Sequence, residues 1–166
     1  MWSFGFLLAG FLATTNAGRV ALARERSRPR PGSVALALAA GIALVVVAVV
    51  FADDVLDALS ISPESFRIAA GIVLAVTAVR TLLWPAASAG PFAAVLITPE
   101  LACLALSFGA DEPLARTLGA AAASLAVAAI AAAARLPIPA ALTAQLLAAL
   151  QVVVAVALAI SGMRDV

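Results

Sequence analysis

The residue best suited to chemistry is Glu100, which lies in the sequence Ile97-Thr98-Pro99-Glu100-Leu101. A carboxylate inside the apolar run from Pro91 to Phe108 is costly in hydrocarbon and needs an internal reason. Pro99 removes a backbone donor and disturbs the preceding turn of helix. We interpret Glu100 as a protonatable or cation-binding group that faces a polar cavity. A glutamate that favours the start of a half-helix opened by Pro99 is the alternative, and the two are compatible.

A second interruption of an apolar run occurs near the amino terminus, at Thr14-Thr15-Asn16-Ala17-Gly18. In one interpretation, its side-chain oxygens and freed backbone carbonyls bind a substrate. In the other, the threonine hydroxyls bond back to carbonyls of their own helix, and Asn16 caps the entry to the basic link. Two interrupted segments at corresponding places in the two halves of a chain are typical of transporters. The candidate residues for binding a substrate or ion are Glu100, Pro99, Thr98, Thr14, Thr15, Asn16 and Gly18.

Composition favours a membrane protein. The 166 residues are 65% hydrophobic and 11% charged, and the mean hydropathy is +1.17. A soluble domain is about a quarter charged and about half apolar. The absence of histidine excludes a Ser-His-Asp triad and a His-based metal site or proton relay. We expect no enzyme activity, no catalytic residue, no metal and no cofactor.

Apolar runs of about 20 residues, the length that crosses a bilayer, predict six transmembrane helices. They are Trp2–Leu22, Ser33–Ala52, Phe66–Trp84, Pro91–Gly109, Leu114–Ala134 and Ala140–Gly162. The links between them read as loops, including the basic link at 24–32 and the acidic link that begins at Asp53. Ser65 is the expected N-cap of the third helix. The sequence thus predicts an all-α, polytopic membrane protein with a single integral domain over residues 1–166.

The charges predict an orientation. The first link carries Arg19, Arg24, Arg26, Arg28 and Arg30 against one glutamate, Glu25. Arginine-rich short loops stay in the cytoplasm, which places both termini outside. Because each half has three spans, the second half enters from the opposite side, and the halves form two inverted repeats of about residues 1–85 and 86–166. Because this role in setting the topology already explains the arginines, we do not expect the protein to bind nucleic acid. The lipid bilayer is the expected partner, and the sequence does not decide between a monomer and a homo-oligomer.

The run from Ile61 to Leu74, which reads ISPESFRIAAGIVL, resembles the MarC family of bacterial inner-membrane proteins. That family typically shows an Ile-Ser followed by a Phe-Arg-Ile-Ala-Gly-Gly-type run at its third helix. The last segment, ending Ile160-Ser161-Gly162-Met163, looks like the family's last helix. Where the family's first broken segment usually has Asp-Pro or Asn-Pro and then Gly, Asn16-Ala17-Gly18 keeps the glycine and lacks the proline. The resemblance implies a multi-pass protein of the bacterial inner membrane associated with export of small molecules.

These observations predict a secondary transporter or exporter of a small solute. Its site would lie at the membrane midplane between discontinuous helices one and four, with proton coupling through Glu100. The alternative is a non-transporting membrane scaffold or assembly partner. We expect Glu100 to face the first helix, within hydrogen-bonding distance of the hydroxyls of Thr98, Thr14 and Thr15 and the amide of Asn16. Arg80 is the only arginine that we expect to lie deep enough to approach the carboxylate.

Overall fold

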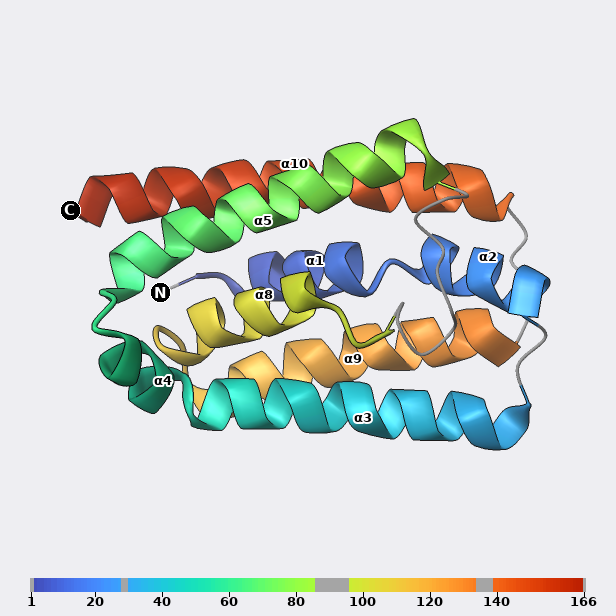
Figure 1. Ribbon diagram of the computed structural model, residues 1–166, viewed down its shortest axis with the longest axis horizontal. Helices are drawn as coiled ribbons and strands as arrows, with labels where there is room; N and C mark the ends of the chain where they lie inside the picture. Colours follow the sequence, from blue (N-terminus) through green and yellow to red (C-terminus); the bar gives the residue numbers. More distant parts are fainter. Residues whose placement is uncertain (1, 28–29, 86–95, 134–138, 166) are drawn as a thin grey trace.

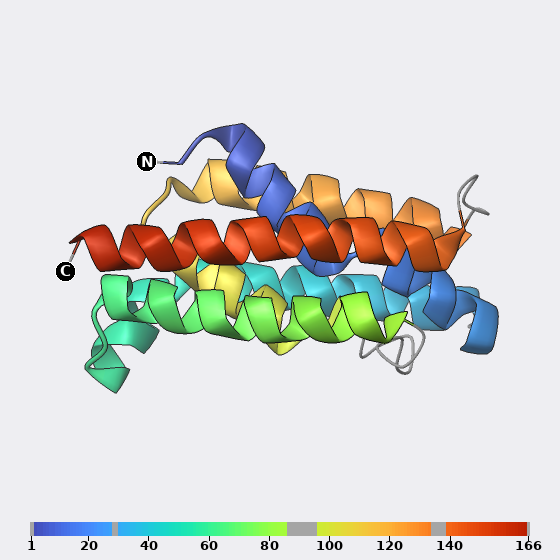
Figure 2. The same cartoon turned by 90° about the horizontal axis from the view of Figure 1, so that it is seen from above.

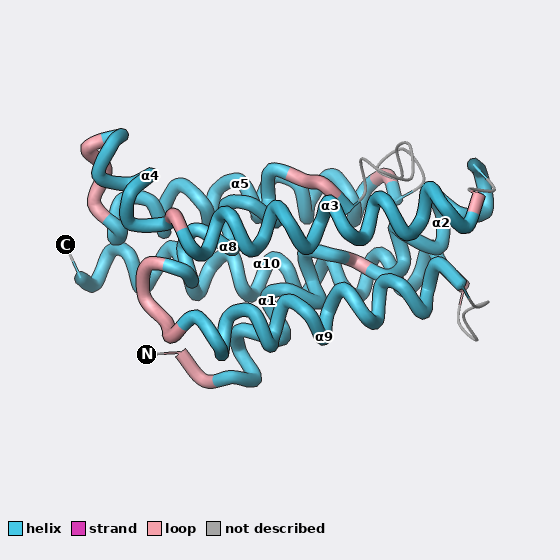
Figure 3. Tube along the Cα trace, turned by 90° about the horizontal axis from the view of Figure 1, so that it is seen from below, coloured by secondary structure: helices cyan, strands magenta, loops and turns pink. Residues whose placement is uncertain are grey.

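The computed structural model describes residues 2–27, 30–85, 96–133 and 139–165, and within these ranges the chain is helical with short links and no strand (Figure 3). The helices are α1 (Phe4–Thr15), α2 (Ala17–Ser27), α3 (Pro31–Val50), α4 (Ala52–Leu59), α5 (Pro63–Leu83), α8 (Pro99–Gly109), α9 (Leu114–Ala133) and α10 (Ala140–Asp165). The prediction of an all-α fold is therefore confirmed.

Five helical segments in the described part of the chain are long and apolar enough to cross a membrane. They are Phe4–Arg26, which joins α1 and α2, and then Gly32–Val50, Pro63–Leu83, Leu114–Ala133 and Ala140–Arg164. The predicted fourth span, Pro91–Gly109, lies partly outside the described residues, and its described part contains α8, a shorter apolar helix. This set of helices indicates a multi-pass membrane protein.

Three boundaries between helices and links differ from those that the sequence predicts, each for a local reason. The N-cap of α5 is Ser62 and not Ser65, because Ser62 Oγ accepts from Ser65 N at 3.3 Å and Pro63 takes the first helical position. The basic link is shorter than expected, because α2 continues to Ser27 with Arg24 and Arg26 in its last turn, where cations favour a helix. The acidic link is itself helical.

That acidic link forms α4, a short amphipathic helix. Ala52 and Leu56 are buried, whereas the apolar side chains of Phe51, Val55 and Leu59 are exposed. The exposed apolar residues recur every four positions and so form one stripe along the helix. A helix with such a stripe is suited to the interface between lipid and water.

The helices lie side by side along the long axis of the molecule, and α4 and both termini lie at the same end of the bundle (Figure 1). We call this the termini end. α5 packs along α10 (Figure 2), and α3 packs along α9. The two pieces α1 and α2 contact α9 and α10, whereas α8 contacts α3 and α5, and α1 touches α8. Each interrupted segment is therefore enclosed by two continuous helices.

Small residues set the close approach of α5 to α10. A Cβ on Gly71 would lie 2.7 Å from the Ala155 carbonyl oxygen, and one on Gly162 would lie 2.6 Å from the Glu64 carbonyl oxygen. Gln151 Nε2 spans the same interface and donates to Leu74 O at 3.1 Å. Close backbone contact with a buried side-chain hydrogen bond is the usual way in which membrane helices associate. The pair α5–α10 is therefore closely packed, and it contacts α2 through α10 and α8 through α5.

Candidate functional site

The first interruption is a single residue, Asn16, between α1 and α2. Its backbone lies in the left-handed region, at φ 41° and ψ 80°, which asparagine adopts more readily than most residues. The Asn16 N–H donates to Leu12 O at 3.1 Å and closes α1, while its carbonyl accepts from Val20 N at 3.2 Å and opens α2. One residue thus ends one helix and begins the next.

The Asn16 side chain fixes this break against α10. Its Oδ1 accepts from the Arg19 backbone N–H at 3.1 Å and caps α2, and its Nδ2 donates to Ala144 O at 3.0 Å. Gly18 permits the approach, because a Cβ there would lie 2.1 Å from Ala144 N. The backbones of α2 and α10 are therefore in direct contact at the break.

The second interruption precedes α8. Thr98 is extended, at φ −118° and ψ 146°, and its Oγ1 accepts from Leu101 N at 3.2 Å. Pro99 occupies the first helical position, where the missing N–H costs nothing. Glu100 follows in the first turn, where a negative charge favours the helix dipole. Glu100 therefore occupies the position that the alternative interpretation, a glutamate at a helix start, requires.

The two interruptions meet at an ion pair. Arg19 Nη1 donates to Glu100 Oε1 at 2.9 Å, and the two side chains are 11% and 4% exposed. Arg19 lies in the first turn of α2, where the dipole disfavours a cation, so the carboxylate offsets both the charge and its unfavourable position. Removing one partner of a buried pair is strongly destabilising, because it leaves the other charge uncompensated. The pair therefore ties α2 to α8.

The predicted site residues have different fates. Asn16, Gly18, Thr98, Pro99 and Glu100 all lie at the two interruptions, as described above. Thr14 and Thr15 are buried, but their hydroxyls donate to carbonyls of their own helix, at 2.7 Å to Gly10 O and 2.9 Å to Phe11 O.

The expected partners of Glu100 need correction. The side chain that bonds to its carboxylate is Arg19 and not a threonine or the Asn16 amide. The expectation that Arg80 is the arginine within reach was wrong, because Arg80 is exposed in the last turn of α5. Arg19 was assigned to the basic link, although it lies inside the predicted first span and three residues after Asn16. A charge within a span that immediately follows a helix break is the signal that could have found it.

A second set of polar contacts lies at the termini end. Arg67 of α5 donates to Asp111 Oδ1 at 2.6 Å in the turn after α8, and Arg116 of α9 pairs with Glu112 Oε2 at 3.1 Å. The amino-terminal segment joins them, because Trp2 N donates to Glu112 Oε1 and Trp2 O accepts from Arg116 at 3.0 Å. These contacts tie α5 and the start of the chain to the α8–α9 turn.

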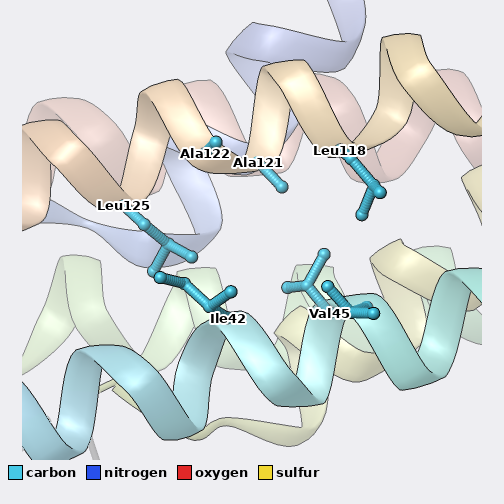
Figure 4. A pocket seen from close by; sticks show the side chains of 7 residues that line it. Ile42, Val45, Leu118, Ala121, Ala122 and Leu125 are labelled. Carbon is cyan, nitrogen blue, oxygen red and sulfur yellow. The ribbon is translucent and has the colours of Figure 1, made fainter.

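A pocket of about 140 Å³ lies between α3 and α9. Its lining is entirely apolar and comes from the two helices that face each other in Figure 4. The lining residues are Ile42, Val45, Val46, Leu118, Ala121, Ala122 and Leu125. Glu100 does not line it, so this pocket is not the polar cavity that the sequence predicted. Within the described ranges, no group of three or more His, Cys, Asp or Glu residues is placed to hold a metal ion.

Comparisons of this chain with protein-family models, with curated proteins and with solved structures found no match. The resemblance to the MarC family therefore stays a prediction based on the residues quoted for it.

Proposed function

We propose that this protein is a secondary transporter of a small solute, with its site where α2 and α8 begin. The observation that carries the proposal is the buried Arg19–Glu100 pair at the meeting point of two helix breaks. Breaks in spanning helices and paired charges within the membrane are both costly, and in transporters they form the substrate and ion site. Here both costs occur at one place.

The pair also provides a means of coupling binding to movement. A proton or cation that binds Glu100, or an anion that binds Arg19, competes with the contact that ties α2 to α8. A ligand shifts a conformational equilibrium only through different interactions with the two states. Competition for this contact supplies such a difference, so ligand binding at the pair would free the two segments to move.

The helix contacts support an arrangement as two inverted repeats. Suppose that the first span (α1 with α2) is exchanged for the fourth (α8), α3 for α9, and α5 for α10. The contacts of the first span with α9 and α10 then become the contacts of α8 with α3 and α5. The contacts α5–α10, α3–α9 and α1–α8 map onto themselves under the same exchange, whereas the smaller α8–α9 contact has no counterpart of that size between the first span and α3. The main contacts thus support a two-fold relation between the halves, and under such a relation the Arg19–Glu100 pair would lie near the axis.

The resemblance to the MarC family supports a location in the bacterial inner membrane, with export as the direction of transport. The basic residues that end α2 favour the cytoplasm for that end of the bundle and the outside for the termini end.

A non-transporting scaffold is the second candidate. It is favoured by the enclosure of Glu100, which is 3% exposed and bonded directly to Arg19. An ion pair of this kind also serves as a fixed structural tie between two segments. A scaffold needs the tie to be intact, whereas a transporter needs it to be exchangeable.

Solute flux separates the two candidates. Purified protein is reconstituted into liposomes, and the liposomes are loaded with a panel of radiolabelled amino acids, carboxylates and sugars. Efflux of each solute is then measured with and without a pH gradient. We expect flux of at least one solute, its loss in Glu100→Leu, and loss of its pH-gradient dependence in Glu100→Gln. Ser124→Ala is the matched control, because Ser124 is a buried polar residue whose hydroxyl donates to Ala121 O within α9. Normal flux in Glu100→Leu would remove Glu100 from the site.

A further inference from the structure

One face of α8 carries polar residues from the ion pair to the termini end. Glu100, Cys103 and Ser107 follow one another at intervals of three and four residues, and Asp111 follows four residues later in the turn beyond the helix. Residues at these intervals lie above one another on a helix. At about 1.5 Å per residue, Ser107 is roughly 10 Å from Glu100 along the axis, and Asp111 lies beyond the end of the helix.

The neighbours of α8 place this face. A Cβ on Gly109 would contact Val49 of α3, and one on Gly10 of α1 would contact the Phe108 ring. Each residue turns a helix by about 100°. Going back along the chain, Gly109 faces α3, Phe108 faces α1, and Ser107 lies a further 100° or so around the helix, on the side away from α3. The next helix in that direction is α5, which Asp111 already contacts through Arg67. This face therefore turns toward the side between α1 and α5, where Ser107 is buried and Cys103 is partly buried against apolar residues.

Two atoms on this face are buried without a hydrogen-bond partner in the described part of the chain. They are Ser107 Oγ, in a residue only 2% exposed, and Asp111 Oδ2. Buried polar atoms of this kind are rare, and in most proteins they bond to an internal water. By contrast, Ser124, which is equally buried in α9, donates to Ala121 O at 2.8 Å. Ser107 Oγ and Asp111 Oδ2 thus share the side of α8 that also carries Glu100.

We infer that this face binds a file of water molecules that connects the termini end of the bundle with Glu100. Asp111 lies at its mouth, Ser107 holds its middle, and the Glu100 carboxylate is its inner end. Such a file carries protons as well as water. A hydronium ion at the inner end gives its proton to a Glu100 oxygen and remains as water, while Arg19 keeps its own proton and charge. The use of the path in coupling depends on the proposed transport function, whereas its existence does not.

The path can be tested on the unmodified protein. Isotopically labelled protein in lipid is studied by solid-state NMR in which magnetisation passes from water protons to the nearest carbons. We expect the signal of the Ser107 Cβ to rise at the rate of an exposed serine such as Ser62, and several-fold faster than that of Ser124. Equal slow rates for Ser107 and Ser124 would overturn the inference.

A pair of substitutions at the middle of the path tests its continuity. Ser107→Leu places a branched apolar side chain in the file, whereas Ser107→Ala leaves room for water. We expect the carboxyl carbon of Glu100 to lose its fast transfer from water in Ser107→Leu and to keep it in Ser107→Ala. Fast transfer in both would show that water reaches Glu100 by another route. If Ser107→Leu does not fold, the comparison of Ser107 with Ser124 in the unmodified chain decides the question.

The outcomes are distinct from those of the flux experiment. Fast water transfer to Ser107 without flux of any solute leaves the path in place and removes its role in transport. Flux without fast transfer to Ser107 keeps the transporter and shows that Glu100 is reached from the other end of the bundle.

Discussion

Replacing Gly18 with alanine should destabilise the protein more than its single added methyl group suggests. The new Cβ would lie 2.1 Å from Ala144 N, 2.5 Å from Ala144 Cα and 2.7 Å from Ala140 O. All three are backbone atoms of α10, so no side chain can rotate away to make room. To reach the 3.4 Å at which ordinary contact begins, α2 and α10 must separate by roughly 1.3 Å.

That separation also affects the break itself. Asn16 Nδ2 donates to Ala144 O at 3.0 Å, and a shift of this size takes the pair out of hydrogen-bonding range. Overpacking costs about 1–3 kcal/mol, and the lost hydrogen bond adds about 1 kcal/mol. The higher helix propensity of alanine returns about 0.5–1 kcal/mol. We therefore expect Gly18→Ala to lower the free energy of unfolding by about 1–3.5 kcal/mol.

The measurement is unfolding of the purified protein in mixed micelles by increasing mole fraction of SDS, followed by tryptophan fluorescence. Trp2 is a suitable probe, because its ring stacks on Phe6 at a centroid distance of 4.4 Å. Gly119→Ala in α9 is the matched control, since its Cβ would meet only the Phe4 ring, at 3.9 Å. We expect this control to equal or exceed the stability of the unmodified protein. If the Gly18→Ala variant were as stable as the Gly119→Ala variant, the close contact of α2 with α10 would be refuted.

Three further predictions use the same protein. Arg19→Ala and Glu100→Ala should each lower the free energy of unfolding by about 3–5 kcal/mol, and the double variant should lose clearly less than their sum, since each single change leaves a buried charge unpaired; additive losses in the SDS titration would rule out coupling. Gln151→Leu should cost about 0.6–2 kcal/mol in that titration through the lost contact with α5, and an unchanged midpoint would contradict that role. In a Cys103→Ala background, a membrane-impermeant thiol reagent added to intact cells should label Ser65→Cys and not Glu25→Cys, because the arginines keep the end of α2 inside; the reverse pattern would invert the orientation.

The sequence predicts five of the helical spans well, because an apolar run of bilayer length has few alternatives. The fifth predicted span, Leu114–Ala134, coincides with α9 over its described residues, and the first, Trp2–Leu22, overlaps the helical segment Phe4–Arg26 from Phe4 onward. The ends of the links were harder to predict. Ser62 and Ser65 both suit an N-cap, and only the position of Pro63 after Ser62 favours the earlier one. The α4 helix is not predicted, because three aspartates among its eight residues are typical of a link between spans.

The candidate site was predicted only in part. The helix breaks follow from local chemistry, since proline and asparagine act on their own neighbours. The partner of Glu100 does not, because it depends on how α2 and α8 are packed across 81 residues of sequence. Gly18 illustrates the same limit. Its role comes from Ala144, which nothing near Gly18 in the sequence indicates.

The burial of Arg19 has a consequence for biosynthesis. The first span is made long before Glu100 exists, and its mean hydropathy of 1.3 is well below the 2.8 of Gly32–Val50. An arginine within a span costs about 2.5–3.5 kcal/mol on insertion by the translocon. We therefore expect the first span to insert less readily by itself than Gly32–Val50. Pairing of Arg19 with Glu100 would then stabilise a span that was inserted earlier in synthesis.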